Sequence, residues 1–283
     1  MKRTVLLWIL AFLITALTAY YQRVTGPTYP LSGKTAINGA EVKYKLERSH
    51  VTSSDAPVTV AVPDSSFSGV LKWKRYKTSD SWTNVPMEYK SGNLTASLPR
   101  QPAAGKLEYR VLLENSSQTA LLPMGQNVVI RFKGDVPIFI LIPHVIAMFG
   151  AMMLSTRTGL EFFNKTPNLK RLTIWTLGFL FVGGMILGPL TQLYAFNALW
   201  TGYPFGTDLT DNKTLIALLG WIAAAFAIFR SKRPKISALI AAVVLLIVYM
   251  IPHSMFGSEL DYNKIDKQKN RIETSQGKVS LNP

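Results

Sequence analysis

The chain has 283 residues, of which 48% are hydrophobic, a net charge of +15 and no cysteine. The missing cysteine excludes disulfides, iron–sulfur clusters, thiol catalysis and thioether-linked lipid anchors. Apolar residues are concentrated in five long runs, and polar residues in one block between Gln22 and Asp135. This uneven distribution indicates membrane-spanning segments combined with one polar domain, rather than two soluble domains.

The five apolar runs predict five transmembrane helices. A helix of about 20 apolar residues crosses roughly 30 Å of hydrocarbon, and in lipid its backbone groups must be hydrogen-bonded within the helix. In chain order the predicted spans are Thr4–Tyr20, Val136–Ser155, Leu172–Tyr194, Thr214–Phe229, which is somewhat short, and Ile236 to about Phe256. The first run also has the length of a signal-peptide core. The small-x-small rule is poorly met, because Leu17 precedes Ala19 by two positions, and this favours a retained anchor.

Lysine and arginine residues predict the orientation of these spans. Three short segments hold ten basic residues against one acid, Glu161. The basic residues are Lys2, Arg3, Arg157, Lys165, Lys170, Arg171, Arg230, Lys232, Arg233 and Lys235. Because the three segments alternate correctly with five crossings, we expect all of them, and the N-terminus, in the cytoplasm. We expect a multi-pass protein of the plasma (inner) membrane, in contact with membrane lipids. No nucleic-acid partner is expected, since basic residues elsewhere are scattered among acids.

The polar block reads as strands, because short apolar alternations are interrupted by turn residues every 8 to 12 positions or so. The predicted strands are EVKYKLER, VTVAV, SGVLKWKRY, NVPMEY, NLTASLP, KLEYRVLLE, QTALLP and NVVIRF. In KLEYRVLL the alternation directs Leu107, Tyr109 and Val111 inward. About seven or eight strands in this length indicate a β-sandwich. His50, in ERSHV, is expected near a strand end, at the rim of that domain.

The segment from Ser68 to Asn115 has a tryptophan-bearing strand that leads to a Val-Pro-Met segment and then to a run from Thr95 to Val111. Over residues 40–132 these features resemble the immunoglobulin-like or fibronectin-type-III-like modules of bacterial exported proteins. The resemblance implies a fold and an interaction role, and no particular substrate. The four remaining spans resemble no family of known activity.

The predicted fold class is therefore an α+β membrane protein, a five-span helix bundle with an inserted extracytoplasmic β-sandwich. Residues 1–21 are the N-terminal anchor and residues 22–135 the immunoglobulin-like domain. Residues 136–256 are a four-helix transmembrane domain. Residues 257–283 are an extracytoplasmic, partly disordered tail.

Two of the three histidines follow an Ile-Pro pair, His144 in ILIPHVIAMF and His253 in YMIPHSMFGS. Both are expected near the outer ends of their spans. If they share a ligand, the options are one haem b, or one divalent metal completed by Asp208 and Asp211. Other interpretations are a proton-handling role, or hydrogen bonds that hold the bundle together. Asp211 also fits the N-cap of the fourth span, and Asp208 fits the dipole of the same helix end.

Small residues predict close helix packing. Gly183, Gly184 and Gly188 lie in FVGGMILGPL, and Gly220 precedes Ala224 at the small-xxx-small spacing. The main interpretation is a compact bundle, and the alternative is a flat groove for a porphyrin or quinone. Pro189 is expected to kink the third span.

No motif in the sequence announces a reaction. There is no G-x-S-x-G, H-E-x-x-H, phosphate loop or G-x-G-x-x-G after a strand, and no acid or base is expected deep within a span. An enzyme is therefore not the favoured interpretation, and no cofactor is predicted outright. The main hypothesis is a membrane scaffold or assembly subunit whose exported domain binds another membrane or periplasmic protein. The alternatives are a redox or metal-binding subunit and a small-solute permease.

Overall fold

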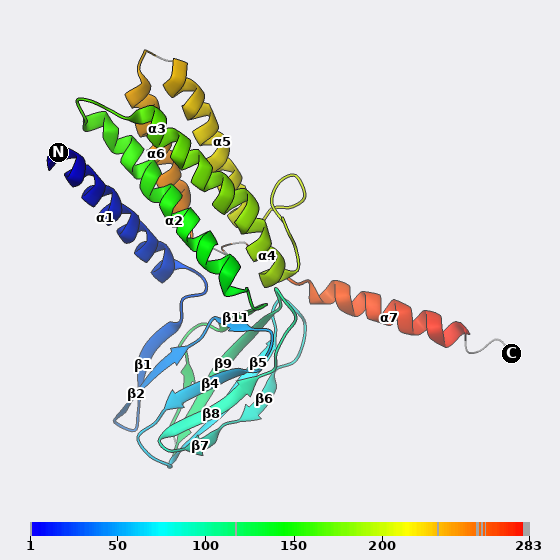
Figure 1. Ribbon diagram of the computed structural model, residues 1–283. Coiled ribbons are helices and arrows are strands. Elements are labelled where there is room, and N and C mark those ends of the chain that lie inside the picture. Colours follow the sequence, from blue (N-terminus) through cyan, green and yellow to red (C-terminus); the bar gives the residue numbers. More distant parts are fainter. Residues whose placement is uncertain are drawn as a thin grey trace. The chain divides into compact units, whose positions relative to one another are not determined.

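The computed structural model describes residues 2–116, 118–230, 232–252, 255, 257 and 259–279. The chain is an α+β protein that divides into two units (Figure 1). The helical unit comprises Met1–Tyr29 and Asp135–Ser258, and the β unit comprises Pro30–Gly134 and Glu259–Pro283. Two β-sheets are built from residues 31–133.

The helical unit consists of long apolar helices. They are α1 (Lys2–Thr25), α2 (Ile138–Leu160), α3 (Leu169–Leu180), α4 (Gly188–Phe196), α5 (Leu209–Arg230) and α6 (Pro234–Met250), with a short 3-10 helix at Glu161–Phe163. A π-helix, Phe181–Leu187, joins α3 to α4, so that Leu169–Phe196 is one continuous apolar element. Among the described residues, four helices are long and apolar enough to cross a membrane: α1, α2, α3–α4 and α5. Helix α6, with 17 residues, is shorter.

Several helix ends differ from the predicted ends of the spans. Helix α6 ends at Met250 instead of about Phe256, because Ile251 is extended (φ −65°, ψ 118°) and a residue that precedes a proline, here Pro252, disfavours helical backbone. Helix α2 continues to Leu160, so Arg157 is part of the helix and not of the following loop.

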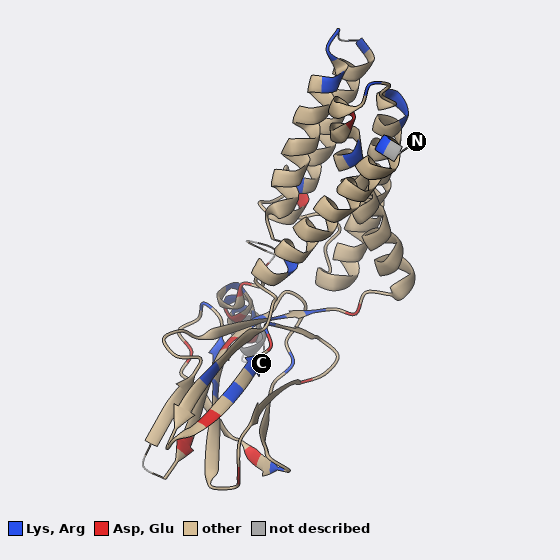
Figure 2. Cartoon of the chain, turned by 90° about the vertical axis from the view of Figure 1, so that its left-hand side faces the viewer, with Lys and Arg blue, Asp and Glu red and all other residues tan. Residues whose placement is uncertain are grey.

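Helix α2 is the centre of the helical unit, where it packs against α1, α3 and α6, while α5 packs against α3 and α6. The core between the helices is built from small and large side chains, including Ala151, Leu180, Trp221 and Leu245. Lys and Arg gather at the end of this unit that carries the N-terminus, the α2–α3 turn and the α5–α6 turn (Figure 2).

The β unit has eleven strands among its described residues. They are β1 (Leu31–Ile37), β2 (Ala40–Leu46), β3 (Ser49–Val51), β4 (Ala56–Ala61), β5 (Phe67–Arg75), β6 (Thr83–Pro86), β7 (Glu88–Lys90), β8 (Asn93–Leu98), β9 (Lys106–Asn115), β10 (Gln118–Leu122) and β11 (Val128–Lys133). The first sheet has the order β1-β2-β4-β8-β7, and the second has the order β3-β11-β9-β5-β6, with β10 paired to β9. Strands β3 and β11 are parallel.

The two sheets enclose one hydrophobic core. Leu107, Tyr109 and Val111 of β9 are fully buried, as the alternation in the sequence predicted. The Tyr109 hydroxyl donates a hydrogen bond to the Glu47 carbonyl oxygen at 2.8 Å, and burial raises the pKa of this phenol. Strand β1 was not predicted, because Ser32, Gly33 and Lys34 break the apolar alternation that the other strands show.

The C-terminal segment, for which the sequence predicts a partly disordered tail, contains a helix. Residues Tyr262–Val279 form helix α7, and residues from Glu259 onward belong to the β unit. Tyr262 is buried, with 6% of its surface exposed, and its hydroxyl donates to Gln101 Oε1 at 2.9 Å. The Leu260 amide donates to the Ala104 carbonyl oxygen at 3.1 Å. Few apolar residues mark this helix, and side chains of its first turns, Tyr262 and Asp266, attach it to the β unit.

Candidate functional site

His144, the first of the two predicted ligands, lies in α2 beside the π-helix. Its ring Nδ1 lies 3.0 Å from the carbonyl oxygen of Gly183, and because a carbonyl only accepts, Nδ1 carries the proton. The same oxygen accepts the amide N–H of Gly188 across the π-helix. A cavity of about 80 Å³ beside His144 is lined also by Gln22, Met148 and other side chains. It is far smaller than the roughly 300–1,000 Å³ of ordinary ligand sites.

Asp208 and Asp211 lie together at the start of α5, where both bind the preceding loop. The Asp208 carboxylate accepts the amide N–H of Thr210 at 2.8 Å, so Asp208 is the N-cap. The N-cap role was expected of Asp211, but α5 begins at Leu209, two residues earlier than Asp211. Asp211 Oδ2 accepts the amide N–H groups of Thr201, at 2.7 Å, and Gly202, at 3.0 Å. These carboxylates therefore hold the loop against the helix.

The described part of the chain contains no group of three or more His, Cys, Asp or Glu side chains that could hold a metal. His253 lies outside the described residues, so the haem or metal that it would share with His144 stays a prediction. His50 lies in β3, with Nε2 3.1 Å from Ser54 Oγ and its ring against the edge of Phe132. These are structural contacts at the rim of a sheet.

Two of the four glycines singled out for helix packing lie against a neighbouring helix. A Cβ on Gly183 would lie 2.9 Å from a side chain of α2, and one on Gly184 would lie 2.6 Å from Thr214 Cγ2 of α5. A Cβ on Gly188 would lie 3.3 Å from a carbonyl oxygen of its own segment. A Cβ on Gly220 would have no atom within 4 Å. Close approach of the helices therefore occurs along the π-helix and not at Gly220.

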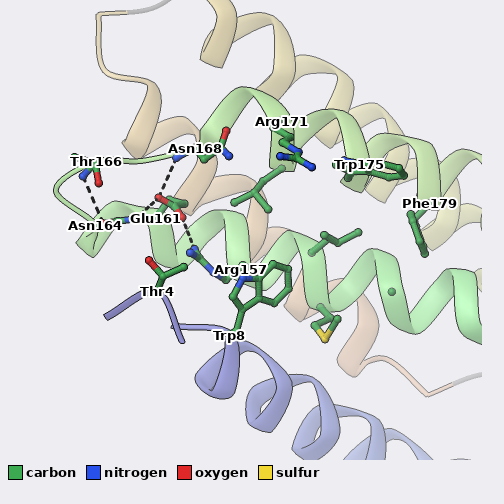
Figure 3. A pocket seen from close by; sticks show the side chains of 14 residues that line it. Thr4, Trp8, Arg157, Glu161, Asn164, Thr166, Asn168, Arg171, Trp175 and Phe179 are labelled. Carbon is green, nitrogen blue, oxygen red and sulfur yellow. Dashed lines mark hydrogen bonds and ion pairs between the residues drawn. The ribbon is translucent and has the colours of Figure 1, made fainter. Parts of the chain in front are cut away.

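A further candidate site is a cavity of about 660 Å³ bordered by α1, α2 and α3 (Figure 3). Its lining is polar at one end and apolar at the other. The polar residues are Thr4, Arg157, Glu161, Asn164, Thr166, Asn168 and Arg171, and the apolar ones are Trp8, Gly150, Met153, Leu154, Leu172, Trp175 and Phe179. We call this the α1–α2–α3 cavity.

Arg157 is the buried cation of this cavity, with 2% of its surface exposed. Its Nη1 lies 2.5 Å from Glu161 Oε1, one helical turn later. Its guanidinium carbon lies 5.4 Å from the centre of the Trp8 ring. The Nε atom is buried and has no hydrogen-bond partner in the part of the chain that the structure describes. Buried N–H groups are nearly always paired, so this donor is an exception.

Glu161 is buried, with 1% of its surface exposed, and its second carboxylate oxygen also accepts hydrogen bonds. Oε2 accepts hydrogen bonds from Asn164 Nδ2 at 2.8 Å and from the Asn168 amide at 3.2 Å. Asn168 is the N-cap residue of α3, so the carboxylate fixes the turn between α2 and α3. Glu161 therefore neutralises Arg157, and three of the roughly four acceptor positions of its carboxylate are used.

The Arg157–Glu161 pair was not predicted, because the predicted second span ends at Ser155 and both residues were placed in the cytoplasmic segment after it. One sequence feature could have predicted the pair. Arg157 and Glu161 have i, i+4 spacing directly after an unbroken apolar run, which places both on one helix face if the helix continues. Ionisable residues on such a continued helix are costly, and they usually have a function.

The β unit carries a second candidate site on the face of the second sheet that points away from its core. Trp82, which precedes β6, lies between two cations: its ring centre is 5.4 Å from Lys74 Nζ and 4.6 Å from the guanidinium carbon of Arg110. Val70 and Leu112 pair across β5 and β9 on the same face. We call this surface the Trp82 face, made of Val70, Lys72, Lys74, Trp82, Arg110 and Leu112.

No protein-family model, no curated protein and no solved structure matches the chain. Inferences about its function therefore come from the geometry of these sites.

Proposed function

We propose that this protein is a five-span protein of the plasma membrane that holds an immunoglobulin-like domain outside the cytoplasm, where the domain binds another membrane or periplasmic protein. The observation that carries the binding role is Trp82 held between Lys74 and Arg110 on the Trp82 face. Tryptophan and arginine are the residues most enriched where binding energy is concentrated in protein interfaces. Lys74 and Arg110 beside the ring favour a partner with an acidic surface, and Glu108, which pairs with Lys74 at 3.8 Å, offsets one of these charges.

Contacts of the tail favour α6 as a fifth crossing. Glu259, which follows α6, binds Lys77 at 2.9 Å and Lys106 at 2.6 Å, so the segments before α2 and after α6 fold into one domain on one side of a membrane. The chain between them must then cross an even number of times. Helices α2, α3–α4 and α5 provide three crossings, and α6 supplies the fourth. Its 17 residues span about 25 Å at 1.5 Å per residue, which a bilayer accommodates by local thinning.

The distribution of charge favours a cytoplasmic N-terminus. The cations of the helical unit gather at the end that carries the N-terminus (Figure 2), and such cations remain on the cytoplasmic side. The packing of α1 favours a retained anchor, because Trp8 contacts Arg157 and Gln22 Nε2 donates to the Ile251 carbonyl oxygen at 3.3 Å. A cleaved signal peptide would leave these groups without partners.

The order of the strands supports the immunoglobulin-like assignment. In that fold one sheet has the order ABED and the other contains C, F and G. Here β2-β4-β8-β7 corresponds to ABED, and β5, β9 and β11 correspond to C, F and G.

Single-cysteine labelling tests the topology, since the chain has no cysteine of its own. Ser97→Cys reports the β domain, Lys232→Cys the α5–α6 turn and Lys267→Cys helix α7, and all three side chains are exposed. In right-side-out vesicles, an impermeant maleimide should label positions 97 and 267 and leave 232 unlabelled until the membrane is opened. Labelling of 267 together with 232 would remove α6 as a span.

Site-specific photo-crosslinking tests the partner. A photoreactive amino acid in place of Trp82 should give one defined adduct in intact membranes, and the same group at Ser97, on the other sheet, should give none. Adding Lys74→Glu and Arg110→Glu to the crosslinking chain should abolish the adduct. If both positions give the same adducts, or neither gives any, the proposed binding role of the Trp82 face is wrong.

A further inference from the structure

We propose that the α1–α2–α3 cavity binds an anionic amphiphile, a phosphate-bearing lipid whose head group lies on Arg157 and Arg171 and whose chain lies along Trp8, Trp175 and Phe179. This site is separate from the Trp82 face, and the inference does not depend on the partner-binding role.

The polar end of the cavity carries more positive than negative charge. Glu161 is the carboxylate of the lining, and both of its oxygens are occupied, by Arg157 and by the α2–α3 turn. Two arginines against this one acid leave an excess positive charge in the lining. Within the described residues the buried Nε of Arg157 has no acceptor, and an ionised oxygen is the strongest acceptor for a guanidinium.

The residue type favours phosphate over a simple anion. Arginine presents its donors in a planar fork that matches the oxygens of a phosphate, and it is less strongly hydrated than lysine. Asn168 and Thr166 border the same end of the cavity, where they can donate to further head-group oxygens. Basic pockets between membrane helices are a recurrent way of holding anionic lipid head groups.

The apolar end excludes a ligand that is polar throughout. The apolar walls of the cavity are formed by Trp8, Gly150, Trp175 and Phe179 together with methionine and leucine side chains. Trp175 is half exposed, at 52%, on a helix of membrane length, so the cavity is open to the lipid layer at this point. The volume, about 660 Å³, lies within the range of roughly 300–1,000 Å³ that ligand sites have. An acyl or isoprenoid chain fits these walls, whereas free phosphate would leave them bare.

Native mass spectrometry of the full chain, purified in mild detergent, tests this inference. The protein is incubated with phosphatidylcholine and phosphatidylglycerol in equal amounts, and the ratio of the two adducts is measured. The wild type should prefer the anionic lipid. The double variant R157Q/E161Q removes both buried charges together and leaves no unpaired carboxylate. Its preference for the anionic lipid should be at least about tenfold weaker than that of the wild type. R171Q, which changes an exposed side chain, should lose about two- to fivefold.

Arg230→Gln is the matched control. Arg230 is an exposed arginine at the α5–α6 turn, stacked on Phe226 at 4.4 Å, at the same end of the helical unit but outside the cavity. Its variant should keep the wild-type preference within about twofold. R171Q keeps the test valid if R157Q/E161Q fails to fold, as judged by size-exclusion chromatography.

Three outcomes would overturn the inference. They are equal binding of both lipids by the wild type, an equal loss of preference in R230Q and R171Q, and displacement of the anionic lipid by inorganic phosphate at a concentration near that of the lipid. The last result would identify a soluble phosphate as the ligand instead of an amphiphile.

Discussion

Asp266 in helix α7 and Arg75 in strand β5 form a bidentate ion pair, with Nη1–Oδ1 at 3.0 Å and Nη2–Oδ2 at 2.8 Å. The same guanidinium binds Asp80 through Nε at 2.7 Å. Residues 191 positions apart in the chain are thereby joined, and the tail after the last apolar helix becomes part of the β domain. We call this set the tail clasp, made of Arg75, Lys77, Asp80, Lys106, Glu259, Tyr262 and Asp266.

The tail clasp depends on burial of Tyr262 more than on its hydroxyl group. Tyr262→Phe removes only the hydrogen bond to Gln101 and should cost about 0.5–1.5 kcal/mol. Tyr262→Ala also removes the buried ring and should cost about 2–4 kcal/mol. Thermal unfolding of the detergent-purified protein, with Tyr89→Phe as the control on an exposed tyrosine, measures both. Equal effects of the two Tyr262 variants would contradict this view.

Acid should release the tail clasp. Hydrogen bonds from Arg75 hold the pKa of Asp80 and of Asp266 below the usual range. At Glu259 partial burial raises the pKa, but hydrogen bonds from Lys106 and Lys77 outweigh it and lower the pKa overall. A carboxyl group whose pKa is lowered by folding stabilises the folded state at pH values above its unfolded-state pKa, about 3.9 for Asp and 4.3 for Glu. This stabilisation is lost as the pH falls through the pKa of the folded state.

A dye on Lys267→Cys would follow this release by fluorescence anisotropy. Helix α7 should stay attached from pH 7 to about pH 4.5 and detach progressively below about pH 4. In Arg75→Met the detachment should occur at higher pH, since Asp80 and Asp266 then lack their common partner. A tail that stays attached in Arg75→Met throughout the titration would show that these ion pairs do not hold it.

Close helix contact at Gly159 should make this residue intolerant of any side chain. A Cβ there would lie 2.5 Å from Ala242 Cβ, whereas one on Gly220 would meet nothing within 4 Å. Gly159→Ala should therefore cost about 1–3 kcal/mol through overpacking. Gly220→Ala should be neutral or stabilise by up to about 1 kcal/mol, because alanine favours helix. Melting temperatures in detergent compare the two, and a reversed order would refute the helix packing described for α2 and α6.

The loop before α5 should depend on Asp211. Asp211→Ala removes the acceptor of two backbone N–H groups, those of Thr201 and Gly202, and should destabilise the loop by about 1–3 kcal/mol. Asp208→Ala removes an N-cap and should cost about 1 kcal/mol. Limited proteolysis between Asn197 and Asp208 should be faster in Asp211→Ala than in Asp208→Ala. Equal rates in both variants and the wild type would argue against a loop held by these carboxylates.

Periodicity alone was sufficient to locate most of the secondary structure. Apolar runs predicted the long helices, because lipid and helix cores demand continuous apolar sequence. Alternation predicted that Leu107, Tyr109 and Val111 are buried, because successive side chains of a strand point to opposite faces. Strand β1 escaped prediction, since small and polar residues obscure its alternation.

What the sequence by itself determined is which segments are apolar and where the cations lie, both of which are local properties of composition. Only the tertiary structure decided that Arg157 and Glu161 form a buried pair in a cavity, that Asp208 instead of Asp211 caps α5, and that the polar tail joins the β domain. Each of these depends on a contact between groups whose partner, burial or helix boundary is set by the packing of other elements. Charge and hydrophobicity along the sequence do not contain that information. The residue type of an arginine is the same whether it is solvated or buried, and only the fold determines its surroundings.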